Sequence, residues 1–147
     1  MIGQVTARDA RGISLRAPLI LIVEDDRETR QFYSEALASS GFVIDQAHNG
    51  HQALEKALQS SPSLILTDIA VPGIDGIELC RRLRSDARTR AIPVLAITGY
   101  GDRHYQDRAR LAGADHVLIK PCDAESLVRE ARRLLGLQGV RVAGGSA

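Results

Sequence analysis

Three acidic residues, Glu24, Asp25 and Asp26, follow directly after the apolar run 19–23. That run, Leu-Ile-Leu-Ile-Val, has the continuous apolar character of a strand that is buried on both faces. Neighbouring carboxylates repel one another, and each of them resists ionising beside the others. An acidic cluster at the end of a core strand therefore predicts that a cation compensates its charge.

Polar residues also end three other apolar segments of the chain. Asp68, Thr98 and Lys120 each stand at the end of a segment that is typical of a strand. In open parallel sheets, ligands bind beyond the carboxyl ends of the strands. A single acid after a strand is often only a helix cap, and we assign that role to Asp26. The occurrence of an acidic cluster, Asp, Thr and Lys, in this order, at four strand ends predicts one polar site.

The residue types at this edge favour phosphoryl chemistry. Carboxylates in a small, open site suit Mg²⁺, which keeps several waters and commonly binds a phosphate as well. Lys120 supplies a mobile positive charge for a phosphoryl oxygen, and the hydroxyl of Thr98 can donate to another. A carboxylate can itself be the nucleophile, as in enzymes that form aspartyl-phosphate. Asp68 is the best candidate because its strand is expected to be central.

Strands and helices alternate strictly along the chain, which predicts the element that positions each of these residues. Five strands are expected over 18–23, 42–47, 64–68, 92–98 and 116–120. A helix follows each strand, and the predicted N-caps include Asp26, Asn49 and Asp123. The first helix should turn towards the core Phe32, Tyr33, Ala36, Leu37 and Ser40. The helix over about 103–112 has a weaker apolar pattern. Five such pairs predict an α/β fold, a five-stranded parallel sheet that is doubly wound, (βα)5.

Length and composition bound the architecture and the class of protein. The 147 residues suffice for one ordinary domain, which we expect over 18–136, with a flexible N-terminal arm (1–17) and a flexible C-terminal tail (137–147). A net charge of +1 argues against binding nucleic acid through bulk charge. Cys80 and Cys122 form no metal-ligand pattern and are expected to be reduced thiols of a cytoplasmic protein. No apolar run has membrane-spanning length, and no secretory signal is recognisable.

Four stretches of the sequence resemble one known family. The segments IVEDD, LTDIAVPGIDGIEL, AITGYG and LIKPCD look like the receiver domain of two-component response regulators, and the resemblance covers about 18–136. It implies the flavodoxin-like strand order 2-1-3-4-5. It also implies that Asp25 binds Mg²⁺ directly and Glu24 through water, with Asp68 as phosphoacceptor and the backbone carbonyl of Ala70 as a further ligand.

The resemblance assigns roles to three residues nearer the C-terminus. Thr98 matches the switch hydroxyl of the family, and Lys120 matches its phosphate-binding lysine. The bond between Lys120 and Pro121 is expected to be cis, in a turn that aims the lysine.

One position departs from the family pattern, and two others are expected to affect the rate of dephosphorylation. Where the family usually has an aromatic residue that rotates on activation, this chain has Val117. Ala70 and Tyr100 stand two residues after the acceptor and the threonine, at the positions that steer the hydrolytic water. Ala70 cannot hydrogen-bond that water, so an unusual rate of dephosphorylation is expected.

The resemblance implies a signalling switch rather than an enzyme with a separate substrate. A histidine kinase or a histidine phosphotransfer protein would phosphorylate Asp68, and the output would be contact with a downstream protein. We expect a monomer or weak dimer with no contact to nucleic acid or membrane, either stand-alone or the receiver part of a hybrid kinase. An alternative is an aspartate-nucleophile phosphatase of the haloacid dehalogenase type, but Ala70 stands where such enzymes need a second Asp. A nucleotide or flavin binder is a third hypothesis, and the chain lacks the glycine-rich phosphate motifs for it.

Overall fold

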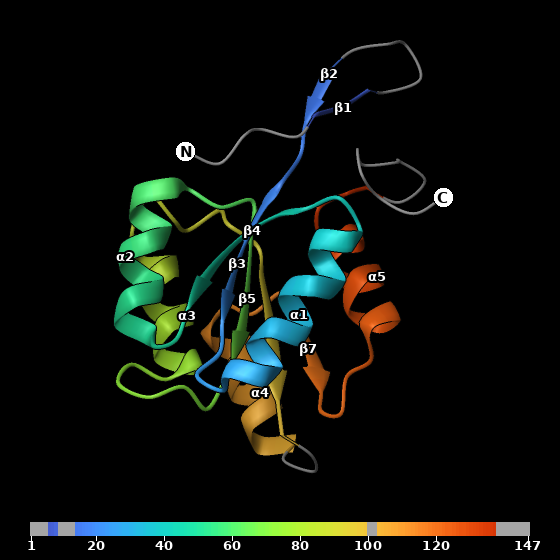
Figure 1. The fold of residues 1–147 in the computed structure, drawn as a ribbon. Helices are drawn as coiled ribbons and strands as arrows, with labels where there is room; N and C mark the ends of the chain where they lie inside the picture. Colours follow the sequence, from blue (N-terminus) through green and yellow to red (C-terminus); the bar gives the residue numbers. More distant parts are fainter. Residues whose placement is uncertain (1–5, 9–13, 100–102, 138–147) are drawn as a thin grey trace.

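Five parallel strands form the central sheet of the protein (Figure 1). They are β3 (Leu19–Val23), β4 (Val43–Ala47), β5 (Leu64–Asp68), β6 (Val94–Thr98) and β7 (His116–Ile119). A computed structural model describes residues 6–8, 14–99 and 103–137. The strands lie in the order β4-β3-β5-β6-β7, which is 2-1-3-4-5 for the five predicted strands. The predicted fold class and strand order are confirmed.

Helices cover both faces of the sheet. They are α1 (Arg27–Ser39), α2 (Gly50–Ser60), α3 (Gly76–Ser85), α4 (Arg103–Ala112) and α5 (Ala124–Leu134). One apolar cluster joins the sheet to α1 and α5, and a second joins it to α2, α3 and α4. Figure 1 shows α1 and α5 side by side over one face of the sheet. The central strands β5 and β6 are buried along their whole length because both faces are covered.

Side-chain caps start four of the helices next to the strand ends. Asp26, Asn49 and Asp123 accept hydrogen bonds from backbone N–H groups in the first turns of α1, α2 and α5, as predicted. Asp75 caps α3 in the same way, by accepting from the N–H of Glu78 at 2.8 Å. The helices therefore begin immediately after the loops that leave the carboxyl edge of the sheet.

The structure differs from the sequence prediction at several element ends. Phe32 was expected to face the core but is 45% exposed, because Tyr33 and Leu37 fill that face of α1. Ser40 is the C-cap of α1 rather than an inward-facing helical residue. The fourth predicted strand begins at Val94, two residues late, since Pro93 has no N–H to pair.

The segment predicted to be a flexible arm contains a short β-ribbon. Strands β1 (Thr6–Arg8) and β2 (Ser14–Arg16) pair antiparallel, which the sequence did not predict. Most of the predicted C-terminal tail lies outside the described residues. No helix in the described ranges combines the length and the apolar character that a membrane crossing requires.

Candidate functional site

The predicted polar residues gather at one edge of the sheet, beyond the carboxyl ends of four strands. Asp68 and Thr98 are the last residues of β5 and β6, while Glu24 and Lys120 directly follow β3 and β7. The strand ladders continue into these positions: the N–H of Ile69 donates to the carbonyl of Ile97 at 2.9 Å, and that of Lys120 to the carbonyl of Thr98 at 2.8 Å. Backbone pairing therefore places the four residues beside one another.

The ammonium group of Lys120 lies between two buried carboxylates. Its Nζ donates to Oε1 of Glu24 at 3.2 Å and also to Oδ2 of Asp68. The side chains of Glu24 and Asp68 are 2% and 7% exposed, whereas that of Lys120 is 35% exposed. The lysine therefore enters the site from the solvent side and serves as counterion to both acids.

The two buried carboxylates, those of Glu24 and Asp68, contact a single cationic group, that of Lys120. Burial, and after it the neighbouring charge of Asp68, together raise the pKa of Glu24 to about 7. Burial works to lower the pKa of Lys120, but the hydrogen bond and the charge of Asp68, with the charge of Glu24, outweigh it and raise that pKa. The lysine is thus held firmly in its cationic form, while Glu24 is the acid that resists ionisation.

The three residues of the acidic cluster occupy different environments. Glu24 is buried, and its Oε2 accepts from the N–H of Asp26 at 3.2 Å. Asp25 is exposed, and Asp26 accepts from the N–H and hydroxyl of Thr29 as the cap of α1. Arg30 donates to the carbonyl of Glu24 at 2.8 Å and so fixes the backbone of the cluster. Sequence reasoning missed Arg30, whose position in the first helix marks it only as a surface residue.

The backbone of Asp68 is packed against the start of α3. The side-chain Oδ1 of Asp68 accepts a hydrogen bond from the N–H of Ala70 at 2.8 Å, and the N–H of Gly76 donates to the carbonyl of Ile69 at 2.8 Å. A Cβ atom at Gly76 would lie 2.6 Å from the carbonyl oxygen of Asp68. The absence of a side chain at Gly76 therefore allows the helix to approach the carboxylate-bearing loop.

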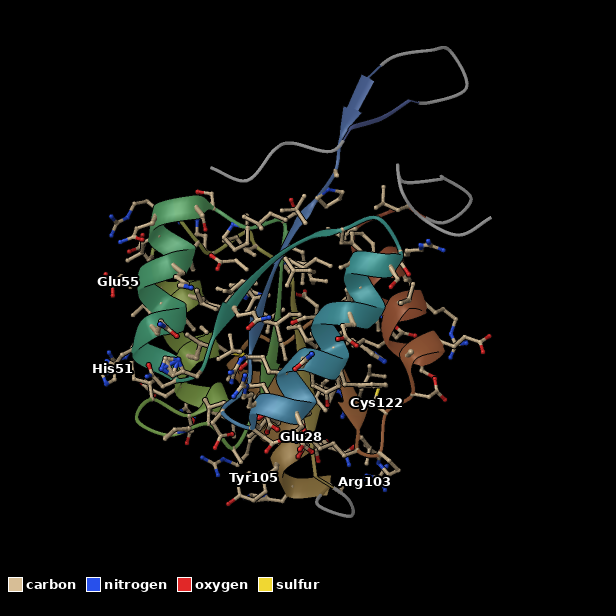
Figure 2. All side chains as sticks on the ribbon, in the orientation of Figure 1. Glu28, His51, Glu55, Arg103, Tyr105 and Cys122 are labelled. Carbon is tan, nitrogen blue, oxygen red and sulfur yellow. The ribbon has the colours of Figure 1, made fainter. Side chains whose placement is uncertain are left out.

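A cavity of about 360 Å³ opens beside Asp68. It is lined by Asp68, Ile69, Ala70, Asp75, Thr98, Gly99 and Tyr105. Tyr105, which lies on the first turn of α4 and is 43% exposed, was not predicted (Figure 2). An aromatic residue a few positions after a strand-end threonine was the available signal. Tyr100, which is predicted to help steer the hydrolytic water, lies outside the described residues.

Val117 occupies the position where the family pattern has an aromatic residue. Its side chain is buried in the apolar cluster that also contains Ala109 and Ala112 of α4. Val117 is therefore part of the packing between β7 and α4 and does not line the cavity. The peptide bond between Lys120 and Pro121 is cis.

The oxygen donors at this edge fit a hard divalent cation that keeps water ligands. Within the described ranges, no group of three or more His, Cys, Asp or Glu side chains is arranged to hold a metal ion unaided. The carboxylates of Glu24 and Asp68 lie together at this edge and Asp25 follows Glu24; such oxygen donors suit Mg²⁺ rather than a metal that needs a full protein cage. The predicted role of the Ala70 carbonyl as a further ligand stays a prediction.

Comparison with known proteins gives a consistent family match. The model of the response regulator receiver domain matches residues 20–132. The DNA-binding dual master transcriptional regulator RpaA of Synechocystis is 38% identical over 118 residues, which are 80% of this chain and 49% of that protein. The chain thus spans about half the length of the curated relatives it matches.

Solved structures of similar fold cover nearly the whole described domain. A response regulator from Chloroflexus aurantiacus has a TM-score of 0.79 and 31% identity, over 82% of this chain and 98% of that one. The receiver domain of a sensor histidine kinase from Pseudomonas aeruginosa has a TM-score of 0.77 and 28% identity, with the same coverage. That structure has a magnesium ion coordinated in its active-site cleft.

Proposed function

Because the chain belongs to the receiver-domain family of response regulators of two-component systems, we propose that it is a switch phosphorylated on Asp68. One observation carries this proposal. Among the described carboxylates, only that of Asp68 both lines the cavity and contacts the ammonium group of Lys120. The nucleophile and the cation that would receive the phosphoryl charge are therefore already neighbours.

The proposed reaction transfers a phosphoryl group from a histidine kinase or a histidine phosphotransfer protein. A carboxylate oxygen of Asp68 attacks phosphorus, so that a P–O bond forms and the P–N bond to the donor histidine breaks. The electron pair of the broken bond stays on the imidazole nitrogen. Lys120, kept cationic by its neighbours, moves its hydrogen bonds from the carboxylate to a phosphoryl oxygen. The hydroxyl of Thr98, buried at the cavity wall, donates to another.

We propose Mg²⁺ as the cofactor of this step. Asp25 would bind it directly and Glu24 through water, with Asp68 and the carbonyl of Ala70 completing the protein ligands. When bound, the ion offsets the negative charge of the acids and of the incoming phosphoryl group.

The same proposal covers how the phosphoryl group is lost and how its presence is transmitted. Ala70 presents only a methyl group beside the acceptor, so it cannot orient a hydrolytic water, and Tyr100 would be left with that role. Val117 is a buried β-branched residue with no ring to rotate. The signal would instead pass through the backbone after Thr98 and through α4, whose first turn borders the cavity.

The output proposed for the domain is contact with another protein, from a monomer or weak dimer. RpaA is described as DNA-binding, but it extends over about twice the aligned length. The haloacid dehalogenase alternative needs an acid where Ala70 stands. Asp75, the other acid at the cavity, is engaged as the cap of α3. We therefore propose no turnover of an independent substrate.

Intact mass spectrometry after incubation with acetyl phosphate and Mg²⁺ tests the proposal. One added phosphoryl group is expected, and it should be lost at alkaline pH. Asp68→Asn should abolish the gain, whereas Asp107→Asn, which alters an exposed acid of α4, should retain it. A phosphoryl group on the Asp68→Asn protein would show that the acceptor has been misassigned.

A further inference from the structure

An apolar side chain projects into solvent at the end of α4 remote from the phosphorylation site. Leu111 is 88% exposed, whereas Phe32, Tyr105 and Ile119, the other large exposed apolar residues among those described, are 43–45% exposed. Leu111 borders a hollow of about 390 Å³ between the last turns of α3 and α4, which is also lined by Arg81, Arg84, Ser85 and Ala112. The apolar residue thus stands beside a depression with a cationic wall.

The segment of the chain that forms the hollow carries a surplus of positive charge. The described residues from 76 to 115 include eight arginines and four acids, although the whole chain has only one more basic than acidic residue. The four acids already have arginine partners, and one of them, Glu78, is shared by Arg81 and Arg82 at 3.3 and 3.4 Å. Arg81 and Arg84 at the hollow are among these paired arginines, but Arg81 shares its only acid with Arg82. Together with Arg90, Arg103 and Arg108, which have no ion pair with a described acid, this leaves the segment with a net positive charge, which favours an acidic partner.

The floor of the hollow is held by Arg84, whose guanidinium ties together three segments. It donates to the carbonyl of Gly113 at 2.7 Å, to that of Ile92 at 2.6 Å, and to Oδ2 of Asp115 at 2.9 Å. Because α3 starts beside Asp68 and the hollow lies at its other end, about 15 Å separates the two along a ten-residue helix. Arg84 therefore holds the α3 side of the surface in place without any contact to Asp68.

We propose that this α3–α4 surface, centred on Leu111, Arg81 and Arg84, docks an acidic, leucine-bearing helical segment of a partner protein. A partner leucine would fill the hollow against Leu111, and partner carboxylates would meet the arginines at the rim. A second copy of this chain fits poorly, since a twofold contact would oppose like charges. A nucleic acid would leave Leu111 without an apolar partner. The inference goes beyond the proposed function because it does not depend on Asp68.

Chemical-shift mapping on the ¹⁵N-labelled full chain tests the docking surface. The probe is a synthetic amphipathic peptide of about 14 residues, or four helical turns, with leucine on one face and glutamate elsewhere. Its two control peptides carry alanine in place of leucine, or lysine in place of glutamate. We expect shifts at amides of the last turns of α3 and α4, with binding weakened by salt.

Variants of the chain sharpen this test. Leu111→Ser and Arg81→Glu should each weaken binding of the acidic peptide by at least about tenfold, as expected for residues central to an interface. Phe32→Ser, a matched change of an exposed apolar residue, should leave binding unchanged. Asp68→Asn should also bind normally, and Leu111→Ser should still be phosphorylated, so failure of docking and failure of the phosphoacceptor assignment are distinguishable.

Four results would overturn the docking proposal. They are the absence of shifts at the two helix ends, equal binding of the alanine peptide, tighter binding of a DNA duplex at the same amides, and Leu111-dependent self-association in sedimentation. The last two would assign the surface to nucleic acid or to a second copy of the chain.

Discussion

Replacing Gly76 with alanine should destabilise the protein and slow its phosphorylation, because the first residue of α3 has no room for a side chain. A Cβ atom there would lie 2.6 Å from the carbonyl oxygen of Asp68 and 2.7 Å from the Cα atom of Ile69. Both neighbours are backbone atoms, so neither can swing away as a flexible side chain would. Relief requires α3 or the loop that carries the acceptor to move.

The size of the effect follows from two opposing contributions. Alanine is favoured over glycine in a helix by up to about 1 kcal/mol. Overpacking a tight contact costs about 1–3 kcal/mol. We therefore expect Gly76→Ala to lower the free energy of unfolding by about 1–2 kcal/mol, which is a fall in Tm of several degrees for a domain of this size, roughly 3–10 °C. Urea unfolding should show a lower midpoint with an unchanged slope.

A matched glycine provides the control for this prediction. Gly99 follows the strand-end threonine, and a Cβ atom there would meet nothing within 4 Å. Gly99→Ala should therefore leave the urea midpoint close to that of the parent protein. Labelling by acetyl phosphate should slow in Gly76→Ala, since that change displaces the backbone of Asp68. A Gly76→Ala protein as stable and as readily labelled as its parent would refute the steric argument.

Three further predictions concern the acidic cluster, the switch hydroxyl and the thiols. Asp25→Ala should lose Mg²⁺-dependent phosphorylation with little change in stability. Asp26→Ala should still be phosphorylated but should lose about 1 kcal/mol of stability, because the cap of α1 is removed. Equal loss of phosphorylation in both variants would contradict the assignment of Asp25 as metal ligand and Asp26 as helix cap. Binding of a phosphoryl mimic at Asp68 should change the protection of amides from hydrogen exchange mainly in α4. Thr98→Ala should reduce that change without preventing phosphorylation. If the change in protection is the same in Thr98→Ala, the signal does not pass through the Thr98 hydroxyl. Burial raises the pKa of Cys80 to about 11, so native alkylation should reach Cys122 first, and the reverse order would contradict the packing.

The positions of the elements could be predicted because they follow from local chemistry. Continuous apolar runs predict strands that are buried on both faces, and Asp or Asn before an amphipathic segment predicts a helix start. These two patterns were enough to bring Asp68, Thr98 and Lys120 to one edge of the sheet. The strict alternation of strands and helices then left a parallel sheet as the consistent topology.

The features that sequence reasoning missed depend on packing between segments distant in the chain. Phe32 and Tyr33 are both aromatic residues in one helix, and which of them is buried depends on how α1 packs on the sheet and on α5. Tyr105 borders the cavity because α4 packs beside α3, which no local pattern reveals. Gly76 reads as the end of a turn, although its close approach to the backbone of Asp68 is a tertiary contact.

The acidic cluster illustrates how one sequence pattern can hold three separate roles. Glu24, Asp25 and Asp26 would repel one another if all three faced the same space. Instead, the chain leaves β3 and enters α1 within these residues, so that their side chains take different directions. Glu24 is buried and shares Lys120 with Asp68, while the other two carboxylates are exposed to solvent, which screens their charge. Burial and the charge of Asp68 together raise the pKa of Glu24 to about 7, at the place where the proposed cation would offset the negative charge.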